Sequence, residues 1–254
     1  MRFKGKVAVI TGGANGIGQA TALLMAREGA KVAIVDIDPT GLEVVAKTIR
    51  AQGGEAVSIE GDVLDEQAVR SAVQQVLNRF GRIDILVNNV GGSTVIANRN
   101  AALEGLTQEE WERTISFNLR GTFLCTRAVV HQMKQQGYGR IVNISSIIAR
   151  GDLRANNAAY VTAKAGIRAL TRRLAIELGP FGITCNAAAP SITLTQRIRR
   201  VTSEGAANGT QMKMKDIPLG RMATPEDQAN VIAFLASDDA AFVSGQTIEV
   251  TGGQ

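Results

Sequence analysis

The chain alternates between two patterns of apolar positions. Short, mostly β-branched runs stand at residues 7–11 (VAVIT), 32–36 (VAIVD) and 56–60 (AVSIE), and further runs follow in IDILVNN, GRIVNISS, GITCNAAAP and QTIEV. Between them lie longer segments, such as GIGQATALLMAREG and EQAVRSAVQQVLNRFG, whose apolar residues recur with the period of an amphipathic helix. Buried strands that alternate with helices form βαβ units and a parallel sheet. We therefore predict a doubly wound α/β fold of about seven parallel strands, with helices on both faces of the sheet.

Three stretches interrupt this alternation, at about residues 92–106, 147–157 and 191–217. Each of them follows a predicted strand. Open α/β sheets bind ligands at the carboxyl ends of their strands, so we expect these stretches to be substrate-side loops. No repeat, linker or low-complexity segment divides the chain, and 254 residues are near the upper limit for one hydrophobic core. A single domain over residues 1–254 is expected.

The composition narrows the classes of function. Apolar residues make up 45% of the chain, yet no run approaches the roughly 18 uninterrupted apolar residues of a membrane span, and no signal-peptide pattern opens the sequence. We expect a cytoplasmic protein that does not bind a membrane. The net charge of +5 is spread along the chain, which argues against a nucleic-acid partner. Cys125 and Cys185 stand alone in apolar runs and His131 has no second histidine, so we expect buried reduced thiols and no metal site.

A glycine-rich loop, TGGANGIG, follows the first strand and opens a helix near Ile17. Its spaced glycines allow a tight turn in which backbone amides and the helix N-terminus approach a pyrophosphate; they are Gly12, Gly16 and Gly18. Asp36 ends the second strand, where its carboxylate can accept hydrogen bonds from ribose hydroxyls and would repel a 2′-phosphate. Neither Asn15 nor Ile37 offers a compensating cation. These features predict a Rossmann dinucleotide site for NAD rather than NADP. The alternative is that Asp36 only caps the next helix.

Tyr160 and Lys164 lie four residues apart in AAYVTAKAG. On a helix this spacing places both side chains on one face, where an ammonium can lower the pKa of a neighbouring phenol. Such a phenol can donate and accept a proton near neutral pH. The other tyrosine, Tyr138, has Val142 four residues on, so only Tyr160 can form the pair. Together with the dinucleotide site, the pair indicates a redox enzyme.

These motifs together resemble the classical short-chain dehydrogenase/reductase family over essentially the whole chain. TGGANGIG resembles the family's TGxxxGxG loop, NNVG its NNAG motif, and YVTAK its YxxxK pair. Asp62 and Val63 resemble the pair that contacts adenine. Asn118 in SFNLRG and Ser146 in IVNISS resemble the catalytic asparagine and serine. The segment PLGRMATPEDQANVIAFLASDDAAFVSGQTIEVTGG resembles the family's C-terminal part.

The resemblance implies an NAD(H)-dependent oxidoreductase that interconverts a secondary alcohol and a ketone by hydride transfer. Tyr160 would be the acid/base, and Lys164 would hold its pKa down and bind the nicotinamide ribose. Ser146 would hydrogen-bond the substrate oxygen, and Asn118 would position a water of a proton relay. The cofactor-binding residues implied are Gly12, Asn15, Gly16, Ile17, Gly18, Asp36, Asp62, Val63, Asn89, Gly91, Tyr160, Lys164, Pro190, Ile192 and Thr195.

One departure from the family pattern concerns the catalytic serine. Ser146 lies fourteen residues before Tyr160, one more than the family's commonest spacing, which would fall on Ile147. Isoleucine cannot hydrogen-bond, so we place the extra residue in the loop IIARGDLRANNA and keep Ser146. Ser145 is the alternative. Because side chains alternate along a strand, Ser145 is expected to point to the other face of the sheet.

A second departure is Pro190-Ser191, where the family has Pro-Gly, so the backbone beside the nicotinamide is expected to differ. The two substrate-side loops that border this region are rich in guanidinium groups, which fits an anionic substrate. The alternative is that these side chains are solvated or pair with other subunits. They are Arg150, Arg154, Arg197, Arg199 and Arg200.

Other functions fit parts of the pattern. NNVGG and ISSIIARG also resemble dehydrogenases of cyclic dihydrodiol carboxylates, and 3-oxoacyl reductases share most of the motifs. A non-catalytic NAD-binding protein is the remaining alternative, which the full set of catalytic residues disfavours. The resemblance further implies a homotetramer, paired through helices at about 108–135 and 158–178 whose apolar positions include Phe123, Val129, Ile167 and Leu174.

Overall fold

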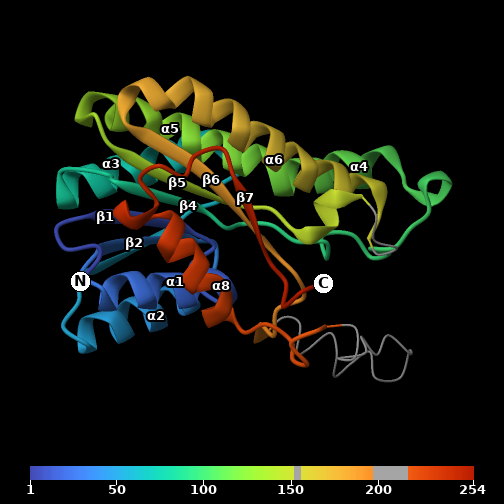
Figure 1. Cartoon of the computed structure of the whole chain (residues 1–254), viewed down its shortest axis with the longest axis horizontal. Helices are drawn as coiled ribbons and strands as arrows, with labels where there is room; N and C mark the ends of the chain where they lie inside the picture. The colour runs from blue at the N-terminus through green and yellow to red at the C-terminus, as the bar shows by residue number, and fades with distance from the viewer. Residues whose placement is uncertain (152–155, 197–216) are drawn as a thin grey trace.

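The computed structural model describes residues 1–151, 156–196 and 217–254, in which strands and helices alternate (Figure 1). The strands are β1 (Val7–Thr11), β2 (Lys31–Asp36), β3 (Ala56–Glu60), β4 (Ile85–Asn88), β5 (Gly139–Ile144), β6 (Ile183–Pro190) and β7 (Thr247–Val250). The α-helices are α1 (Gly16–Arg27), α2 (Pro39–Ala51), α3 (Glu66–Phe80), α4 (Gln108–Ile115), α5 (Gly121–Gln136), α6 (Ala158–Leu178) and α8 (Pro225–Leu235). Short 3₁₀ turns are η1 (Leu103–Gly105), η3 (Ile147–Arg150), η4 (Gly179–Phe181) and η6 (Asp238–Ala240).

All neighbouring strands of the sheet are parallel, in the order β3-β2-β1-β4-β5-β6-β7. The chain runs outward from β1 to β3, returns to place β4 beside β1, and then runs outward in the other direction. This reversal makes the carboxyl ends of β1 and β4 the point where doubly wound sheets bind ligands. The predicted fold class is therefore confirmed, with its seven parallel strands and two helical layers.

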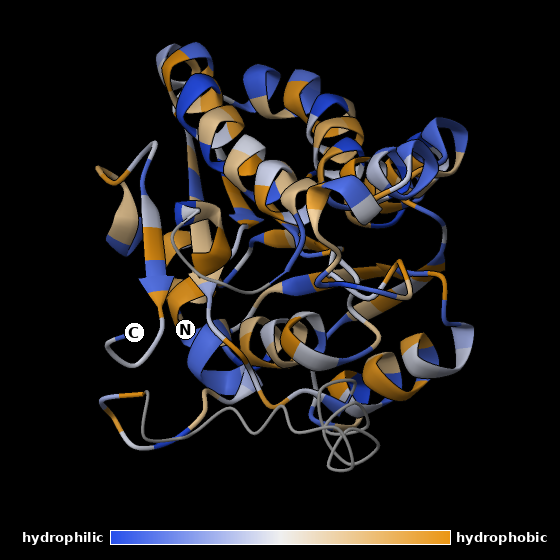
Figure 2. Cartoon of the chain, turned by 90° about the vertical axis from the view of Figure 1, so that its right-hand side faces the viewer, coloured by the Kyte–Doolittle hydropathy of each residue, from blue (hydrophilic) through white to orange (hydrophobic). Residues whose placement is uncertain are grey.

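The sheet lies between two helical layers, with α1, α2 and α8 on one face and α3, α5 and α6 on the other (Figure 1). Successive strand residues point to opposite layers. Ile10 and Ile34 belong to the first core, whereas Val9 and Val35 belong to the second. Figure 2 shows hydrophobic and hydrophilic residues mixed along the flanking helices, as expected for helices that bury one side. Strands buried on both faces explain the continuous apolar runs of the sequence.

Side-chain caps fix where most of the helices begin. A side-chain oxygen of the residue before the helix accepts hydrogen bonds from first-turn amides ahead of α2, α3, α4, α6 and α8. These caps are Asp38, Asp65, Thr107, Asn157 and Thr224. Asn15, before α1, makes no capping hydrogen bond. The first-turn amides of α1 are therefore left for another acceptor.

The long helix expected at about 108–135 is interrupted. A single π-helical turn, Ser116–Arg120, joins α4 to α5. The apolar period of the sequence predicts one continuous helix here and does not reveal the turn. Turns of this kind are frequent at functional sites.

Two of the apolar residues expected to mediate subunit pairing lie inside the protomer. Val129 is 0% exposed and Ile167 is 1% exposed, so both pack inside the protomer, and their assignment to a subunit interface is wrong. Leu174 is half-buried against the core on the α3/α5 face. Phe123, on α5, remains 46% exposed. Helical period alone did not distinguish the sheet-facing side from the outer side of these helices.

The two cysteines are buried free thiols, as expected, and burial raises the pKa of Cys125 and of Cys185 to about 12. His131 is exposed on α5 and contacts Gln135. Among the described residues, no group of three or more His, Cys, Asp or Glu side chains is placed to hold a metal ion. Over the same ranges, none of the helices is long and apolar enough to cross a membrane.

Candidate active site

The glycine-rich loop turns from β1 into α1 with almost no space for side chains. A Cβ atom at Gly18 would lie 2.1 Å from the backbone oxygen of Gly12. Gly16 has φ +57, in the left-handed region, and a Cβ there would lie 3.1 Å from Cγ2 of Thr195. The loop therefore brings its backbone, the uncapped N-terminus of α1 and Thr195 together. Such a cradle fits the pyrophosphate of a dinucleotide.

Asp36 is fixed against this loop. Its Oδ2 accepts a hydrogen bond from the amide of Ala14 at 3.0 Å, and its Oδ1 accepts from the amides of Ile37 at 2.8 Å and Asp38 at 3.2 Å. The cap of α2 is Asp38, which accepts from the amides of its first turn. Asp36 is thus not the helix cap that the alternative assumed. It places a carboxylate at the end of β2, beside the glycine loop.

Asn89 links the ends of the two switch-point strands. Its Nδ2 donates to the backbone oxygens of Thr11 at 3.1 Å and Gly12 at 3.0 Å, and its backbone amide donates to Oγ1 of Thr11 at 3.0 Å. A Cβ at Gly12 or Gly18 would lie less than 3.0 Å from Asn89 Nδ2. Asn89 therefore holds the glycine loop against the end of β4.

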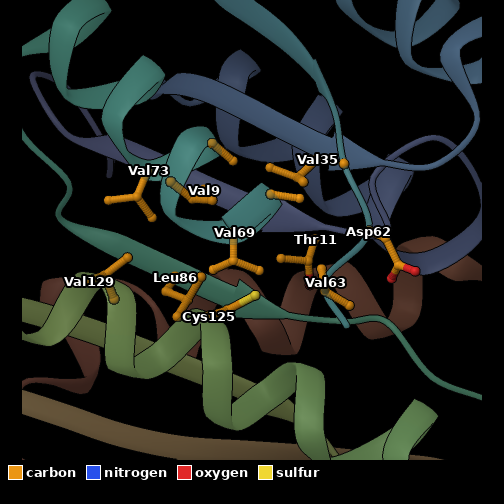
Figure 3. Close-up of a pocket in the computed structure, with 13 residues that line it drawn as sticks. Val9, Thr11, Val35, Asp62, Val63, Val69, Val73, Leu86, Cys125 and Val129 are labelled. Carbon is orange, nitrogen blue, oxygen red and sulfur yellow. The ribbon is translucent and has the colours of Figure 1, made fainter. Parts of the chain in front are cut away.

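Asp62 and Val63 follow β3 at the same edge of the sheet. Asp62 Oδ1 accepts from the amide of Leu64 at 2.9 Å, and Val63 is buried. Figure 3 shows both beside Thr11, at one end of a small apolar cavity of about 20 Å³ that runs into the core toward Val129. The predicted adenine contacts thus lie near the end of β1, where the glycine loop begins.

Lys164 reaches the site from inside the protein. It is 2% exposed, and its Nζ donates to the backbone oxygen of Ile144 at 2.9 Å. Nζ lies 5.9 Å from the centroid of the Tyr160 ring, one helical turn earlier on α6. Desolvation by burial lowers the pKa of Lys164 from its ordinary 10.5 to about 7. Tyr160 itself is only partly buried.

Gly91 and Asn118 complete this cluster. A Cβ at Gly91 would lie 2.8 Å from both Lys164 Nζ and Asn118 Oδ1. The Asn118 side chain makes three hydrogen bonds: its Oδ1 accepts from the amide of Gly92 at 2.8 Å, and its Nδ2 donates to the backbone oxygens of Gly92 and Thr114 at 3.1 and 3.0 Å. Asn118 lies within the π-helical turn and is 0% exposed. Its side-chain amide therefore holds the loop after β4.

Ser145 and Ser146 point to different partners at the end of β5. Ser145 is 2% exposed, and its Oγ donates to the backbone oxygen of Lys164 at 2.9 Å. Ser146 is partly buried; its Oγ accepts from the amide of Ile148 at 3.3 Å and lies 3.5 Å from the backbone oxygen of Pro190. Only Ser146 thus has a hydroxyl on the side of the β6 loop.

The residues after β6 line part of a second cavity, distinct from the one beside Asp62. Pro190 ends the strand and Ile192 is 41% exposed. Thr195 lines a cleft of about 440 Å³ between α1 and the start of α8, together with Gly16. Ser191 stands where the family pattern has glycine. Its hydroxyl is buried and has no hydrogen-bond partner among the described residues.

Arg150 is the one arginine of the two predicted anion-binding loops that the structure describes. Its Nη1 lies 3.3 Å from Oε2 of Glu249 and 3.4 Å from the backbone oxygen of Gln254. Arg168 lies 3.7 Å from the other carboxylate oxygen of Glu249. Arg150 therefore pairs within the protomer, which neither the anionic-substrate prediction nor its alternative had expected. The remaining predicted arginines, Arg154, Arg197, Arg199 and Arg200, lie outside the described residues.

Comparisons with known proteins show the family to which this chain belongs. A family model described as enoyl-(acyl carrier protein) reductase matches residues 12–254. The chain belongs to the short-chain dehydrogenase/reductase family. It is 41% identical over 254 residues to the (2S)-[(R)-hydroxy(phenyl)methyl]succinyl-CoA dehydrogenase subunit BbsD of Thauera aromatica, covering 100% of this chain and 98% of that protein.

Two further similarities cover the whole length of this dehydrogenase/reductase. The 3-oxoacyl-[acyl-carrier-protein] reductase FabG of Thermotoga maritima is 38% identical over 254 residues, which are 100% of this chain and 99% of that protein. The crystal structure of levodione reductase matches with a TM-score of 0.91 and 36% identity, covering 100% of this chain and 98% of that chain. The chain is therefore an oxidoreductase of a family that binds nicotinamide cofactors.

One residue of this dehydrogenase/reductase escaped the sequence reasoning. Asn157 caps α6 and accepts a hydrogen bond from the amide of Tyr160 itself. The sequence does contain a signal for it, because an asparagine directly before a segment with helical periodicity is typical of an N-cap. The sequence places an extra residue in the loop before Tyr160 and predicts that this loop borders the substrate, but it does not single out Asn157.

Proposed function

We propose that the protein interconverts a secondary alcohol and a ketone with NAD(H) as cofactor. The observation that carries the proposal is the pair of Tyr160 and Lys164 on α6, whose ammonium lies beside Gly91 after β4, while Ser146 stands at the end of β5 and the glycine cradle at the end of β1. Hydride transfer to a ketone needs a cofactor held against the carbon and a proton donor held against the oxygen. These residues supply the second requirement and the cradle supplies the first.

The preference for NAD rests on Asp36. Its carboxylate is held by three backbone amides at the end of β2 and lies where a ribose hydroxyl would donate to it. A 2′-phosphate in the same place would meet a fixed negative charge. Ile37, which is 68% exposed, brings no cation to offset it. When bound, the nicotinamide supplies or accepts the hydride.

Tyr160 is the proposed acid/base at the substrate oxygen. The ammonium of Lys164, one turn along the same helix, favours the ionised phenol by its charge. Because burial brings the pKa of Lys164 to about 7, that charge changes close to neutral pH. The Lys164 ammonium is also the group best placed to bind the nicotinamide ribose, since it lies beside Gly91.

Ser146 and Asn118 have supporting roles in the proposal. The Ser146 hydroxyl donates to the substrate oxygen and holds it near Tyr160. The side-chain amide of Asn118 is taken up by Gly92 and Thr114, so its part in a proton relay falls to its backbone carbonyl, within the π-helical turn. That carbonyl would accept a hydrogen bond from the relay water.

A second candidate concerns the substrate. Two of the similar proteins are named for thioesters, a substituted succinyl-CoA and a 3-oxoacyl group on acyl carrier protein. A third, of Sinomonas cyclohexanicum, is named cis-4-hydroxycyclohexanecarboxylate dehydrogenase. These names favour a β-hydroxy or β-oxo acyl thioester, or a cyclic hydroxy acid, as the first substrates to try. A cyclic dihydrodiol carboxylate remains an alternative, and a non-catalytic NAD-binding role remains the least favoured.

The test is a screen of alcohols and ketones from these classes with NAD, NADP and their reduced forms, followed by nicotinamide absorbance. We expect turnover with NAD(H) and its loss by several powers of ten in Tyr160→Phe, which keeps the ring but removes the proton. NAD binding should persist in the variant. Turnover by Tyr160→Phe near that of the wild type would refute the assigned mechanism.

We also propose that the enzyme acts as a cytoplasmic homotetramer. Phe123 on α5 and Ile176 on α6, which are 46% and 66% exposed, are apolar side chains that an interface between subunits would cover. Light scattering at micromolar concentration should give the mass of four chains, with a dimer as the second choice. A monomer would contradict the proposal.

A further inference from the structure

Two neighbouring asparagines tie the catalytic helix to the first substrate-side loop. Asn157 is 2% exposed and uses both ends of its amide. Its Oδ1 accepts from the backbone amide of Tyr160 at 3.0 Å, and its Nδ2 donates to the backbone oxygen of Arg99 at 3.1 Å. One side chain therefore contacts the helix that carries Tyr160 and the loop at residues 92–106.

A second contact lies beside the first. The backbone amide of Asn156 donates to Oδ1 of Asn100 at 2.9 Å. Asn156 has φ 67 and is the one non-glycine residue in the left-handed region among the residues that the structure describes. Asparagine tolerates this conformation better than other side chains do. Asn98 closes the loop locally by accepting from the amides of Asn100 and Ala101.

The other end of this loop segment is also tied to the catalytic cluster. Gly92 forms two hydrogen bonds with the side chain of Asn118, which lies between α4 and α5. Residues 92–100 are thus held at one end by the helix of Asn118 and at the other end by the cap of the Tyr160 helix. Movement of the loop would be transmitted to both.

We propose that Asn157 is a positioning residue for Tyr160 and couples its placement to the loop at 92–106. The inference rests on the proposed function of Tyr160. The amide of Tyr160 belongs to the first turn of α6, which has no preceding helical turn to hold it. Asn157 fixes that turn, and its bond to Arg99 fixes the substrate-side loop relative to it. A displacement of about 1 Å at a reacting group can lower the rate about a hundredfold.

Three substitutions separate the two functions of Asn157. Asn157→Ala removes the cap and the bond to Arg99. Asn157→Ser keeps an oxygen that can cap the helix but is too short to donate to Arg99. Asn100→Ala removes only the neighbouring tie. The matched control is Asp65→Ala, which removes the cap of α3, a helix that carries none of the proposed catalytic residues.

The kinetic measurements are kcat, KM and NAD affinity, with the melting temperature recorded for each variant. We expect kcat to fall at least about tenfold in Asn157→Ala. In Asn157→Ser, kcat should largely recover while KM for the substrate rises several-fold, and Asn100→Ala should raise KM alone. Asp65→Ala should lower the melting temperature as Asn157→Ala does, with kcat and KM unchanged. Equal kcat in Asn157→Ala and Asp65→Ala would overturn the proposal.

Amide hydrogen exchange gives a readout that does not need a substrate. We expect faster exchange at Tyr160 in Asn157→Ala but not in Asn157→Ser, and faster exchange in residues 92–101 in both. Slow exchange of the loop in every variant would show that the coupling is absent. If the wild-type enzyme turns over no substrate, the proposed function fails, and the exchange data still decide whether Asn157 couples the two segments.

Discussion

Replacing Lys164 by methionine measures what an ammonium group buried beneath the site does to the stability of the fold. Burial lowers the pKa of Lys164 from 10.5 to about 7. At about 1.4 kcal/mol for each pH unit, the charged side chain destabilises the folded protein by about 5 kcal/mol. Methionine keeps much of the length and packing of lysine without the charge. We therefore expect Lys164→Met to lose activity and to change how stability depends on pH.

The direction of this dependence follows from the two pKa values. Below about pH 7, Lys164 is charged in both the folded and the unfolded state, and the whole destabilisation is present. Between about 7 and 10.5, unfolding takes up a proton, so the free energy of unfolding rises with pH. From about pH 6.5 to about pH 9.5, this group should add about 3 kcal/mol to the stability of the wild-type protein. Lys164→Met should lack that increment.

Urea unfolding of the cofactor-free wild type and Lys164→Met at both pH values tests this. At each pH, the free energy of unfolding of Lys164→Met is subtracted from that of the wild type. Comparing this difference between the two pH values cancels the titration of other groups. The packing lost with the substitution does not depend on the charge of Nζ, so it lowers stability equally at both pH values and cancels too. Lys31→Met, at a lysine whose side chain is 42% exposed, is the control and should show no such change. If the difference in the free energy of unfolding between wild type and Lys164→Met changes by less than about 0.5 kcal/mol between the two pH values, burial does not lower the pKa of Lys164 as stated.

Three further predictions concern the rest of the site. Ser146→Ala should lower kcat/KM at least about tenfold, as measured by steady-state kinetics. Ser145→Ala loses a buried hydrogen bond to Lys164, so it should lower the free energy of unfolding in urea by about 1 kcal/mol and leave most of the activity. Asp36→Ala with Ile37→Arg should move preference toward NADP in titrations of both cofactors, and a wild-type preference for NADP would contradict the basis of the change. Gly18→Ala should fold yet bind NAD at least about tenfold more weakly by calorimetry, because its Cβ would meet a backbone oxygen at 2.1 Å; unchanged affinity would argue against the cradle.

Much of the fold could be predicted because its signals are local in the sequence. The apolar run 7–11 and the helical period after it each report a pattern of burial that one segment shows by itself. The glycine loop is equally local, since a residue at φ +57 next to a close backbone approach favours glycine whatever packs around it. The i, i+4 spacing of Tyr160 and Lys164 fixed their common helix face in the same way.

The parts that could not be predicted depend on partners far apart in the chain. Strand alternation favoured Ser146 over Ser145, but the hydrogen-bond partners of the two hydroxyls, Lys164 on α6 and Pro190 on β6, could not be predicted. Arg150 looked available for an anionic substrate until the fold placed Glu249 beside it.

Lys164, Asn118 and Asn157 show the same limit at the centre of the site. Sequence spacing placed Lys164 beside Tyr160, but only the packing of α6 on the sheet buries its ammonium and lowers its pKa. Asn118 was identified by its motif, whereas the π-helical turn and its bonds to Gly92 required the folded loop. The chain by itself thus determined which elements form and which residues stand at their ends. The tertiary structure decided which polar groups find partners, because burial and hydrogen-bond satisfaction depend on segments that meet only after folding.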